Sequence, residues 1–379
     1  MNKSSSLAII LVFLAVSGIL MVQPVTASAN SWVTKAPMPT ARFAFGAAAV
    51  NGIIYAIGGI VVLPNGAETT TNVNEAYDPA SNSWVEKAPM PSPNWLDSFG
   101  IAVYPNKIYC IGGPANNVYD PATDSWQSKT PMPTPRHFLD ANVVEGKIYL
   151  MGGRTDISSG SYSLSAVNEV YDPETDSWTK KAPVPQAVAS YASVVVDNKI
   201  YVISGSVTDL VQVYDPKTDK WSTAAPIPIA VENAAAGAIT NTATPNAIYV
   251  VGGSTANNPS LSQNFTQVYF PQNNSWSVGA PIIANRTELS VVVVDDTLYA
   301  LGGANWGESY PIMSSIYQYS PNNYAVTPTS LPSSSPAPTE SSTASPTPTP
   351  SVPEFPSWFA FQLMFVMVLA AVFARKRKL

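Results

Sequence analysis

A unit repeated six times along Trp32 to Tyr324 constrains the fold of this chain more than any other feature of its sequence. Each unit combines an apolar segment that ends in a glycine pair, a tyrosine, a tryptophan and a proline-containing connector. The glycine pairs are at 58–59, 112–113, 152–153, 252–253 and 302–303, with Ser204-Gly205 in the remaining unit. The tyrosines are Tyr77, Tyr119, Tyr171, Tyr214, Tyr269 and Tyr319, and the tryptophans are Trp32, Trp84, Trp126, Trp178, Trp221 and Trp276. Successive glycine pairs lie 40 to 54 residues apart, so the chain is a repeat array rather than two average domains.

Within each unit the apolar segments have the length and composition of β-strands. Runs such as Lys147–Met151 and Ser193–Val196 are short, rich in β-forming residues and bounded by turn residues. No segment between the two ends of the chain keeps a period of 3.6 residues. Each unit therefore has room for about four strands, and four-stranded units at this spacing are typical of propeller blades.

This pattern resembles the kelch family, and the resemblance covers nearly all of residues 30–325. It implies an all-β fold, a six-bladed kelch-type β-propeller. The position of the tryptophans also predicts how the ring closes, because Trp32 precedes the first glycine pair and no tryptophan follows Tyr319. We expect the N-terminal strand around Trp32 to close the last blade as its outermost strand, which removes an open sheet edge.

The N-terminal residues 1–29 have the three parts of a signal peptide. Lys3 precedes an apolar run from Leu7 to Val22, and a small-x-small sequence ends at Ala29. An uncleaved N-terminal anchor is the alternative, and both interpretations place the repeats outside the cell. At the other end, residues 326–352 consist almost wholly of Pro, Ser, Thr and Ala, a composition that favours an extended stalk without a core.

Residues 353–379 predict a membrane anchor. The segment from Trp358 to Ala374 contains no charge and the basic run Arg375–Lys378 follows it. The 18 residues from Ser357 to Ala374 would span about 27 Å as a helix, enough to cross the bilayer core, whereas a buried core helix would have to lie beyond the stalk. The order Pro353–Pro356, apolar helix and basic tail resembles the sorting signals cut by exosortase- and archaeosortase-type enzymes. The resemblance implies a sortase-type processing enzyme as a partner and a lipid in place of the helix.

Composition excludes several functions. The net charge is −6 and the pI about 4.9, so nucleic acid is not expected as a partner. The single histidine, His137, cannot form a two-histidine metal site, and we expect neither a metal nor a cofactor. The single cysteine, Cys110, occupies a position that is apolar in the other units, which predicts a buried core thiol.

Loop lengths indicate which face is free to bind a ligand. From the second glycine of the pair to the repeat tyrosine the distances are 18, 6, 18, 9, 16 and 16 residues, whereas tyrosine to tryptophan is always 7. The variable loops and the connectors should emerge together on one face. The first three positions after the connectors are Arg42-Phe43-Ala44, Asn94-Trp95-Leu96, Arg136-His137-Phe138, Val188-Ala189-Ser190, Val231-Glu232-Asn233 and Arg286-Thr287-Glu288.

The candidate ligand-binding residues on this face are Arg42, Phe43, Asn94, Trp95, Arg136, His137, Arg154, Glu232, Asn233, Arg286, Thr287, Glu288, Asn305 and Trp306. Trp95 and Trp306 are the strongest candidates, because neither belongs to the six repeat tryptophans. The alternative for the arginines is that they bind loop carbonyls, as kelch relatives imply.

These features predict a cell-surface binding module that recognises a protein or a glycan through its variable loops. One alternative is a sugar-modifying enzyme of the sialate-epimerase kelch type, with Glu232 or Glu288 and Arg286 in the acid–base roles. Another is a structural component of a surface layer. Three Asn-x-Ser/Thr sequons, at Asn264, Asn273 and Asn285, are glycosylation candidates in an exported chain.

Overall fold

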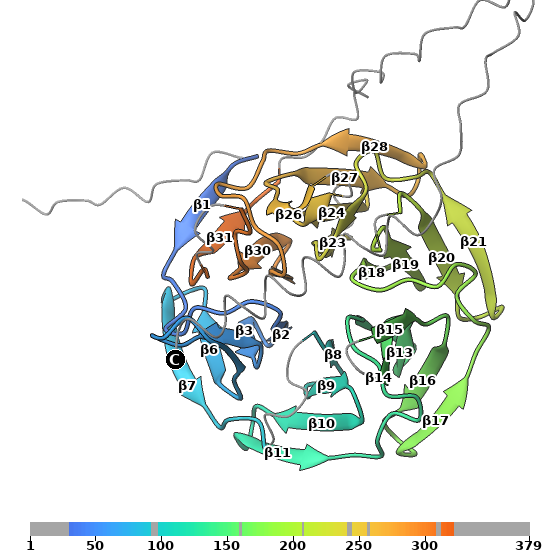
Figure 1. Ribbon diagram of the computed structural model, residues 1–379, viewed down its shortest axis with the longest axis horizontal. Coiled ribbons are helices and arrows are strands. Elements are labelled where there is room, and N and C mark those ends of the chain that lie inside the picture. Colours follow the sequence, from blue (N-terminus) through green and yellow to red (C-terminus); the bar gives the residue numbers. More distant parts are fainter. Residues whose placement is uncertain are drawn as a thin grey trace, which may run out of the picture. The chain divides into compact units, whose positions relative to one another are not determined.

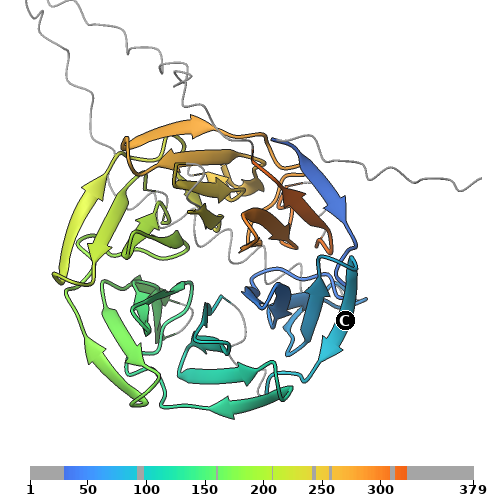
Figure 2. The same ribbon diagram turned by 180° about the vertical axis from the view of Figure 1, so that it is seen from behind.

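The computed structural model describes residues 30–91, 98–158, 161–206, 208–240, 245–255, 258–307 and 312–321. In this part of the chain the regular structure is entirely β, with six four-stranded sheets and no helix. Figure 1 and Figure 2 show the sheets arranged side by side in a ring around a central axis. The predicted all-β propeller fold is confirmed.

The six sheets are numbered in chain order, and every neighbouring pair of strands within them is antiparallel. Sheet 1 contains β2 (Gly46–Val50), β3 (Ile53–Ile57), β6 (Asn74–Asp78) and β7 (Ser83–Lys87). Sheet 2 contains β8 (Gly100–Val103), β9 (Ile108–Gly112), β10 (Ala115–Asp120) and β11 (Ser125–Ser128). Sheet 3 contains β12 (Ala141–Val144), β13 (Lys147–Met151), β16 (Asn168–Asp172) and β17 (Ser177–Lys180).

Sheets 4 and 5 repeat the arrangement, and sheet 6 takes one strand from the start of the chain. Sheet 4 contains β18 (Ala192–Val196), β19 (Lys199–Ile203), β20 (Val211–Asp215) and β21 (Lys220–Ala224). Sheet 5 contains β23 (Ala235–Ile239), β24 (Ala247–Val251), β27 (Thr266–Phe270) and β28 (Ser275–Val278). Sheet 6 contains β29 (Ser290–Val294), β30 (Thr297–Leu301), β31 (Ile316–Tyr319) and β1 (Trp32–Lys35).

The ring closes where β1 pairs with β31, in the register Trp32 with Tyr319 and Lys35 with Ile316. Figure 1 shows the blue N-terminal strand beside the red C-terminal strands. The Trp32 indole also donates to the carbonyl of Ala280 in the preceding unit at 3.0 Å. The expected clasp by the N-terminal strand is therefore present.

Three smaller sheets lie in the loops. The strand β4 (Ile60–Val62) pairs with β5 (Glu68–Thr70), and β14 (Arg154–Ser158) pairs with β15 (Ser161–Leu164). In the fifth unit β22 (Val231–Glu232), β25 (Ser254–Thr255) and β26 (Asn258–Ser262) form a three-stranded sheet. All of these strands belong to connectors or to loops between the second and third strands of a sheet.

The core lies between adjacent sheets, as where the Tyr77 ring of sheet 1 meets the Tyr299 ring of sheet 6 with centres 6.3 Å apart. Within each sheet the repeat tyrosine packs on a repeat tryptophan. The Tyr77 and Trp84 rings are 5.1 Å apart, and the corresponding Tyr–Trp pairs recur around the ring at 4.9 to 5.1 Å. Cys110 is buried and unpaired, as its apolar equivalents predict. At Gly59 φ is +95°, and an added Cβ would lie 2.5 Å from the Phe45 Cβ, so this glycine is required for both conformation and space.

Among the described residues no helix is long and apolar enough to cross a membrane. The predicted signal peptide (1–29), stalk (326–352) and C-terminal helix (Trp358–Ala374) lie outside the described residues.

Candidate functional site

The connectors and the loops between second and third strands share one face of the ring. Phe43 in the connector before sheet 1 bridges Ile60 in the following loop, and His137 bridges Arg154 in the same way. In the fifth unit the connector strand β22 pairs with the loop strand β25. These pairings confirm the expected arrangement, and we call this surface the loop face.

The opposite surface, the turn face, is built from turns of constant length that form hydrogen bonds to the neighbouring unit. Asn82 Oδ1 accepts hydrogen bonds from the Tyr77 hydroxyl at 2.7 Å and from the Ala36 backbone N–H at 2.9 Å. The Trp84 indole donates to the carbonyl of the same Ala36 at 3.0 Å. The same acceptor role falls to Asp124, Asp176, Asp219 and Asn274 in the following units. The seven-residue spacing of tyrosine and tryptophan is therefore explained by structure, not by a ligand.

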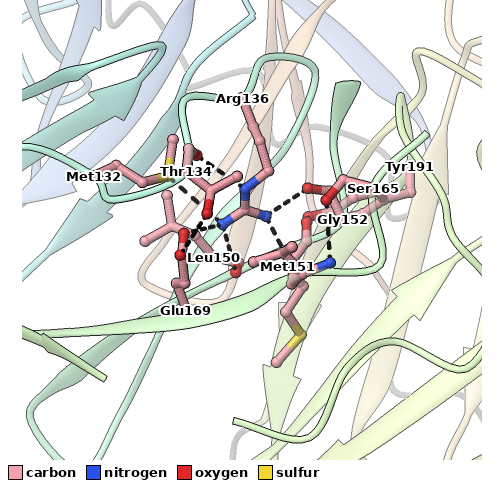
Figure 3. Close-up of polar contacts among 10 residues, drawn as sticks. Met132, Thr134, Arg136, Leu150, Met151, Gly152, Ser165, Glu169 and Tyr191 are labelled. Atoms are coloured by element: carbon pink, nitrogen blue, oxygen red, sulfur yellow. Dashed lines mark hydrogen bonds and ion pairs between the residues drawn. The ribbon is translucent and has the colours of Figure 1, made fainter. Parts of the chain in front are cut away.

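Three of the predicted ligand-binding residues are arginines that the structure buries completely. Arg42, Arg136 and Arg286 each have 0% of their surface exposed. Figure 3 shows the Arg136 guanidinium surrounded by backbone carbonyls and by Glu169, which lies 2.9 Å from Nη2. Its Nη1 donates to the carbonyls of Gly152 and Val167.

Arg42 repeats this arrangement with Glu75 at 2.7 Å, and burial lowers the pKa of Arg42 to about 10 although Glu75 opposes the shift. Arg286 lies 4.4 Å from the centre of the Tyr317 ring instead, and burial lowers its pKa to about 10 as well. All three guanidinium groups thus bind loop carbonyls, which is the alternative that the sequence left open. They hold the loops in place and present no charge at the surface.

The sequence already contained a sign of this structural role for the connector arginines. The residue two positions before the repeat tyrosine is Glu75 or Glu169 where the connector has Arg42 or Arg136. Where the connector has valine, at 188 or 231, this position is a glutamine. Gln212 bonds the backbone of residue 186, and Gln267 bonds the backbone of residue 229. The paired change of both positions indicates a structural contact within each unit.

Just beyond the connectors, six residues form a closed ring of backbone hydrogen bonds around the axis. Each donates its N–H to the carbonyl of its counterpart in the preceding unit, at 2.8 to 3.0 Å. All six have left-handed backbone conformations, with φ between 53° and 55°. The members of this axial ring are Ala44, Ser98, Phe138, Ser190, Asn233 and Glu288.

The axial ring corrects one register derived from the sequence. In the second unit its member is Ser98, two residues later than Leu96, which the sequence placed at this position. The equal count from the connectors therefore fails in this unit. Asn94 and Trp95, two of the predicted binding residues, lie outside the described residues.

A cavity of about 220 Å³ opens along the axis at this ring. It is lined by the axial ring and by the first residues of the innermost strands of the sheets. The only charged residues among the described residues that line it are Asp140 and Glu288. Serine hydroxyls, the Asn233 amide and Tyr191 supply the remaining polar lining.

Asp140 is the functional candidate that sequence reasoning missed. Its Oδ2 accepts hydrogen bonds from the backbone N–H and the hydroxyl of Ser193, at 2.9 and 3.1 Å. Burial raises the pKa of Asp140 to about 6, and the bonds from Ser193 oppose that shift. The sequence did contain a sign of it. Of the cavity-lining residues that directly precede an innermost strand, Asp140 is the one acidic residue.

Arg154, predicted from its loop, contacts two residues that line the cavity, Phe138 and Ser190. Its guanidinium carbon is 4.4 Å from the ring centres of both Phe138 and Tyr162, so the group is held between two aromatic faces. Its Nη2 donates to the Ser190 hydroxyl at 3.3 Å. Phe138 and Ser190 are adjacent members of the axial ring, which places the guanidinium over the junction of sheets 3 and 4.

The remaining predicted residues are distributed over the loop face. The Phe43 and Trp306 rings pack edge to face with centres 5.3 Å apart, and Thr287 is buried with its hydroxyl on the Asn233 carbonyl. Asn305 Oδ1 is buried without a hydrogen-bond partner in the described part of the chain. Glu232 lies half-buried in β22.

Two loop hairpins carry exposed apolar side chains on this face. At the β4–β5 hairpin Val62 and Leu63 are 43% and 41% exposed. At the β14–β15 hairpin Tyr162 and Leu164 are 53% and 40% exposed. Each hairpin thus presents two exposed apolar side chains, the kind of surface that a partner can cover.

The three sequons occupy different environments. Asn273 and Asn285 are exposed, whereas Asn264 is half-buried. Asn273 and Asn285 are therefore the more accessible glycosylation candidates.

Comparisons with known proteins agree with this architecture. The Attractin/LZTR1 β-propeller family matches residues 115–324, and the kelch motif matches residues 41–91. Kelch-like protein 36 of Bos taurus is 27% identical over 284 residues, which are 74% of this chain and 38% of that protein. Kelch-like protein 35 of Mus musculus is 31% identical over 184 residues, or 46% of this chain and 29% of that protein. The chain thus spans less than two fifths of these curated relatives.

The solved structure of YjhT superposes with a TM-score of 0.60 at 18% identity, covering 74% of this chain and 95% of that one. At this identity the likeness concerns the fold alone.

Proposed function

Because the chain belongs to the Attractin/LZTR1 β-propeller family, we propose that it is a non-enzymatic binding module that recognises a protein through its loop face. In this proposal the six sheets are the six blades of a kelch propeller. The observation that carries it is the contrast between the two faces. The turn face uses its polar groups to join the units, whereas the loop face carries exposed apolar hairpins and the Arg154 stack.

The exposed side chains favour a protein over a free glycan as the main ligand. Val62, Leu63 and Leu164 are aliphatic and have no directional polar groups, whereas sugar recognition depends on hydrogen bonds beside aromatic faces. Tyr162 adds an aromatic ring with a polar end, a residue type enriched at protein interfaces. Glycan recognition remains the alternative, with Trp306 as the aromatic surface.

We further propose that the propeller works at the cell surface. A signal peptide at 1–29 would export it, residues 326–352 would act as a stalk, and the segment 353–379 would anchor it by a helix or, after sortase-type processing, by a lipid. A glycan at Asn273 would be compatible with its exposure. A role in a surface layer would instead appear as self-association.

One of the residues that the sequence assigned to the enzymatic alternative, Arg286, is not accessible in the structure. Arg286 is fully buried with its guanidinium on the Gly302 carbonyl and the Ser315 hydroxyl, so it cannot contact a sugar at the surface. Glu232 and Glu288 then lack the arginine that the sequence assigned to this role. We therefore rank the sugar-modifying enzyme below the binding module.

The test compares matched apolar substitutions on the full chain. Leu63→Ser and Leu164→Ser change the loop face, whereas Val85→Ser and Val278→Ser change exposed residues on the outer strands β7 and β28. We expect the loop-face variants to lose capture of an envelope protein that wild type retains, and the outer-strand variants to keep it. A parallel glycan array tests the alternative. Equal loss in both sets of variants, or saturable glycan binding without a protein partner, would overturn the proposal.

A further inference from the structure

The carboxylate of Asp140 lies in the confined axial cavity. It has no cation partner among the described residues. Both bonds from Ser193 go to Oδ2 of Asp140, which leaves Oδ1 available on the described side of the cavity. The neighbouring groups are neutral near pH 6: Ser193 and Tyr191 lie on the β18 side, and Gly100 of β8 packs on the other. The Arg136 guanidinium on the same connector is already paired with its own glutamate. A buried carboxylate in such surroundings is stabilised when a cation occupies the space beside it.

The opposite charge is carried by Arg154, which contacts Phe138 and Ser190 in the lining of the same cavity. Arg154 donates one side-chain hydrogen bond within the described residues, from Nη2 to the Ser190 hydroxyl. The aromatic rings of Phe138 and Tyr162 hold the guanidinium at a fixed orientation. An arginine with N–H donors to spare is suited to a carboxylate. Glu288, the other acidic residue lining the cavity, belongs to the axial ring through its backbone.

We propose that this cavity binds a small amino-carboxylate, with the ammonium group on Asp140 and the carboxylate on Arg154. A ligand with a single charge would pair with only one of the two side chains, Asp140 or Arg154. A cation without a carboxylate would also be repelled by the positive charge of Arg154. The volume of about 220 Å³ is enough for an amino acid. The inference does not depend on a protein partner at the hairpins.

The proposal predicts a specific pH dependence. The ligand requires ionised Asp140, and because the pKa of this carboxyl is raised to about 6, the free protein carries it protonated below about pH 6. Affinity should therefore be constant above pH 7 and fall about tenfold between pH 7 and pH 5.

The experiment is calorimetric titration of the purified full chain with glycine, β-alanine and 4-aminobutyrate. Propylammonium and propionate supply each charge alone. We expect saturable binding of at least one amino-carboxylate at pH 7.5, and binding at least tenfold weaker for both single-charge compounds. Asp140→Asn and Arg154→Met should each weaken binding of the amino-carboxylate tenfold or more. Glu145→Gln is the matched control, because Glu145 is an exposed acidic residue at the other end of β12.

Three results would overturn the proposal: no saturable amino-carboxylate binding, equally tight binding of propylammonium, or unchanged affinity in Asp140→Asn. A thermal melt of each variant checks folding. If a variant unfolds, the wild-type comparison of single-charge compounds and of pH 7.5 with pH 5 still decides the question.

Discussion

Breaking the buried pair of Arg136 and Glu169 should cost the folded state several kcal/mol, because neither residue reaches solvent and the remaining charge would be left without a partner. Both side chains are 0% exposed, with 2.9 Å between the guanidinium and the carboxylate. Glu169 also accepts from the Thr134 hydroxyl at 2.7 Å. In Glu169→Gln the guanidinium keeps its carbonyl partners and loses its counter-charge. Removing one partner of a buried pair typically costs about 3 to 5 kcal/mol, and because glutamine retains one acceptor oxygen we expect about 3 kcal/mol.

The chain itself provides the control, because sheet 4 has Val188 and Gln212 at the equivalent positions. The double variant Arg136→Val with Glu169→Gln copies that pair and leaves no charge at this site. Urea unfolding of the full chain should show a double-variant loss smaller than the sum of the single losses by about 2 kcal/mol. The reasoning is refuted if Glu169→Gln lies within about 1 kcal/mol of wild type or if the two losses simply add.

Three further outcomes follow from the geometry. The pKa of Asp140 in the folded state is raised to about 6 from an ordinary value of 3.8, so its ionisation destabilises the fold as the pH rises from 3.8 through 6. Asp140→Asn should therefore be more stable than wild type at pH 7.5 by on the order of 2 kcal/mol. In thermal melts this difference in stability should disappear by about pH 4. Gly59→Ala should cost more than about 2 kcal/mol because its Cβ would meet Phe45, whereas Gly52→Ala, with φ +79° and nothing within 4 Å, should cost about 1 kcal/mol; similar losses at both sites would argue against the close approach. Trp32→Phe removes the indole bond to Ala280 and should cost about 1 kcal/mol in chemical unfolding, and no change would show that this clasp contact is dispensable.

The repeat explains why the fold could be predicted from the sequence. Tyrosine, tryptophan and the turn residue between them act together on one backbone residue of the neighbouring unit, so their spacing cannot vary without breaking the contact. The closure by Trp32 could be predicted for the same reason, since a unit that lacks its tryptophan must receive one. Six repetitions of one pattern carry information that a single strand does not.

The candidate site was harder to predict from the sequence, because the contacts of its residues depend on segments that lie far apart along the chain. Arg42 and Arg286 follow connectors on the loop face, but their side chains turn inward to bind loop carbonyls. Asp140 appears in the sequence as one acidic residue before a strand, and only the ring arrangement brings it to the axis. In the second unit the connector is longer, so counting residues placed Leu96 where Ser98 lies.

The clasp between β1 and β31 also determines how the ring would respond to tension. Trp32 pairs with Tyr319, so the chain enters β1 and leaves β31 at the same end of the pair. A force that draws the two ends apart would load the backbone bonds one after another, as in unzipping, rather than all together in shear. Sheet 6 would open from Trp32 towards Lys35, and this seam would be the mechanically weakest point of a ring whose other strands are joined by continuous chain.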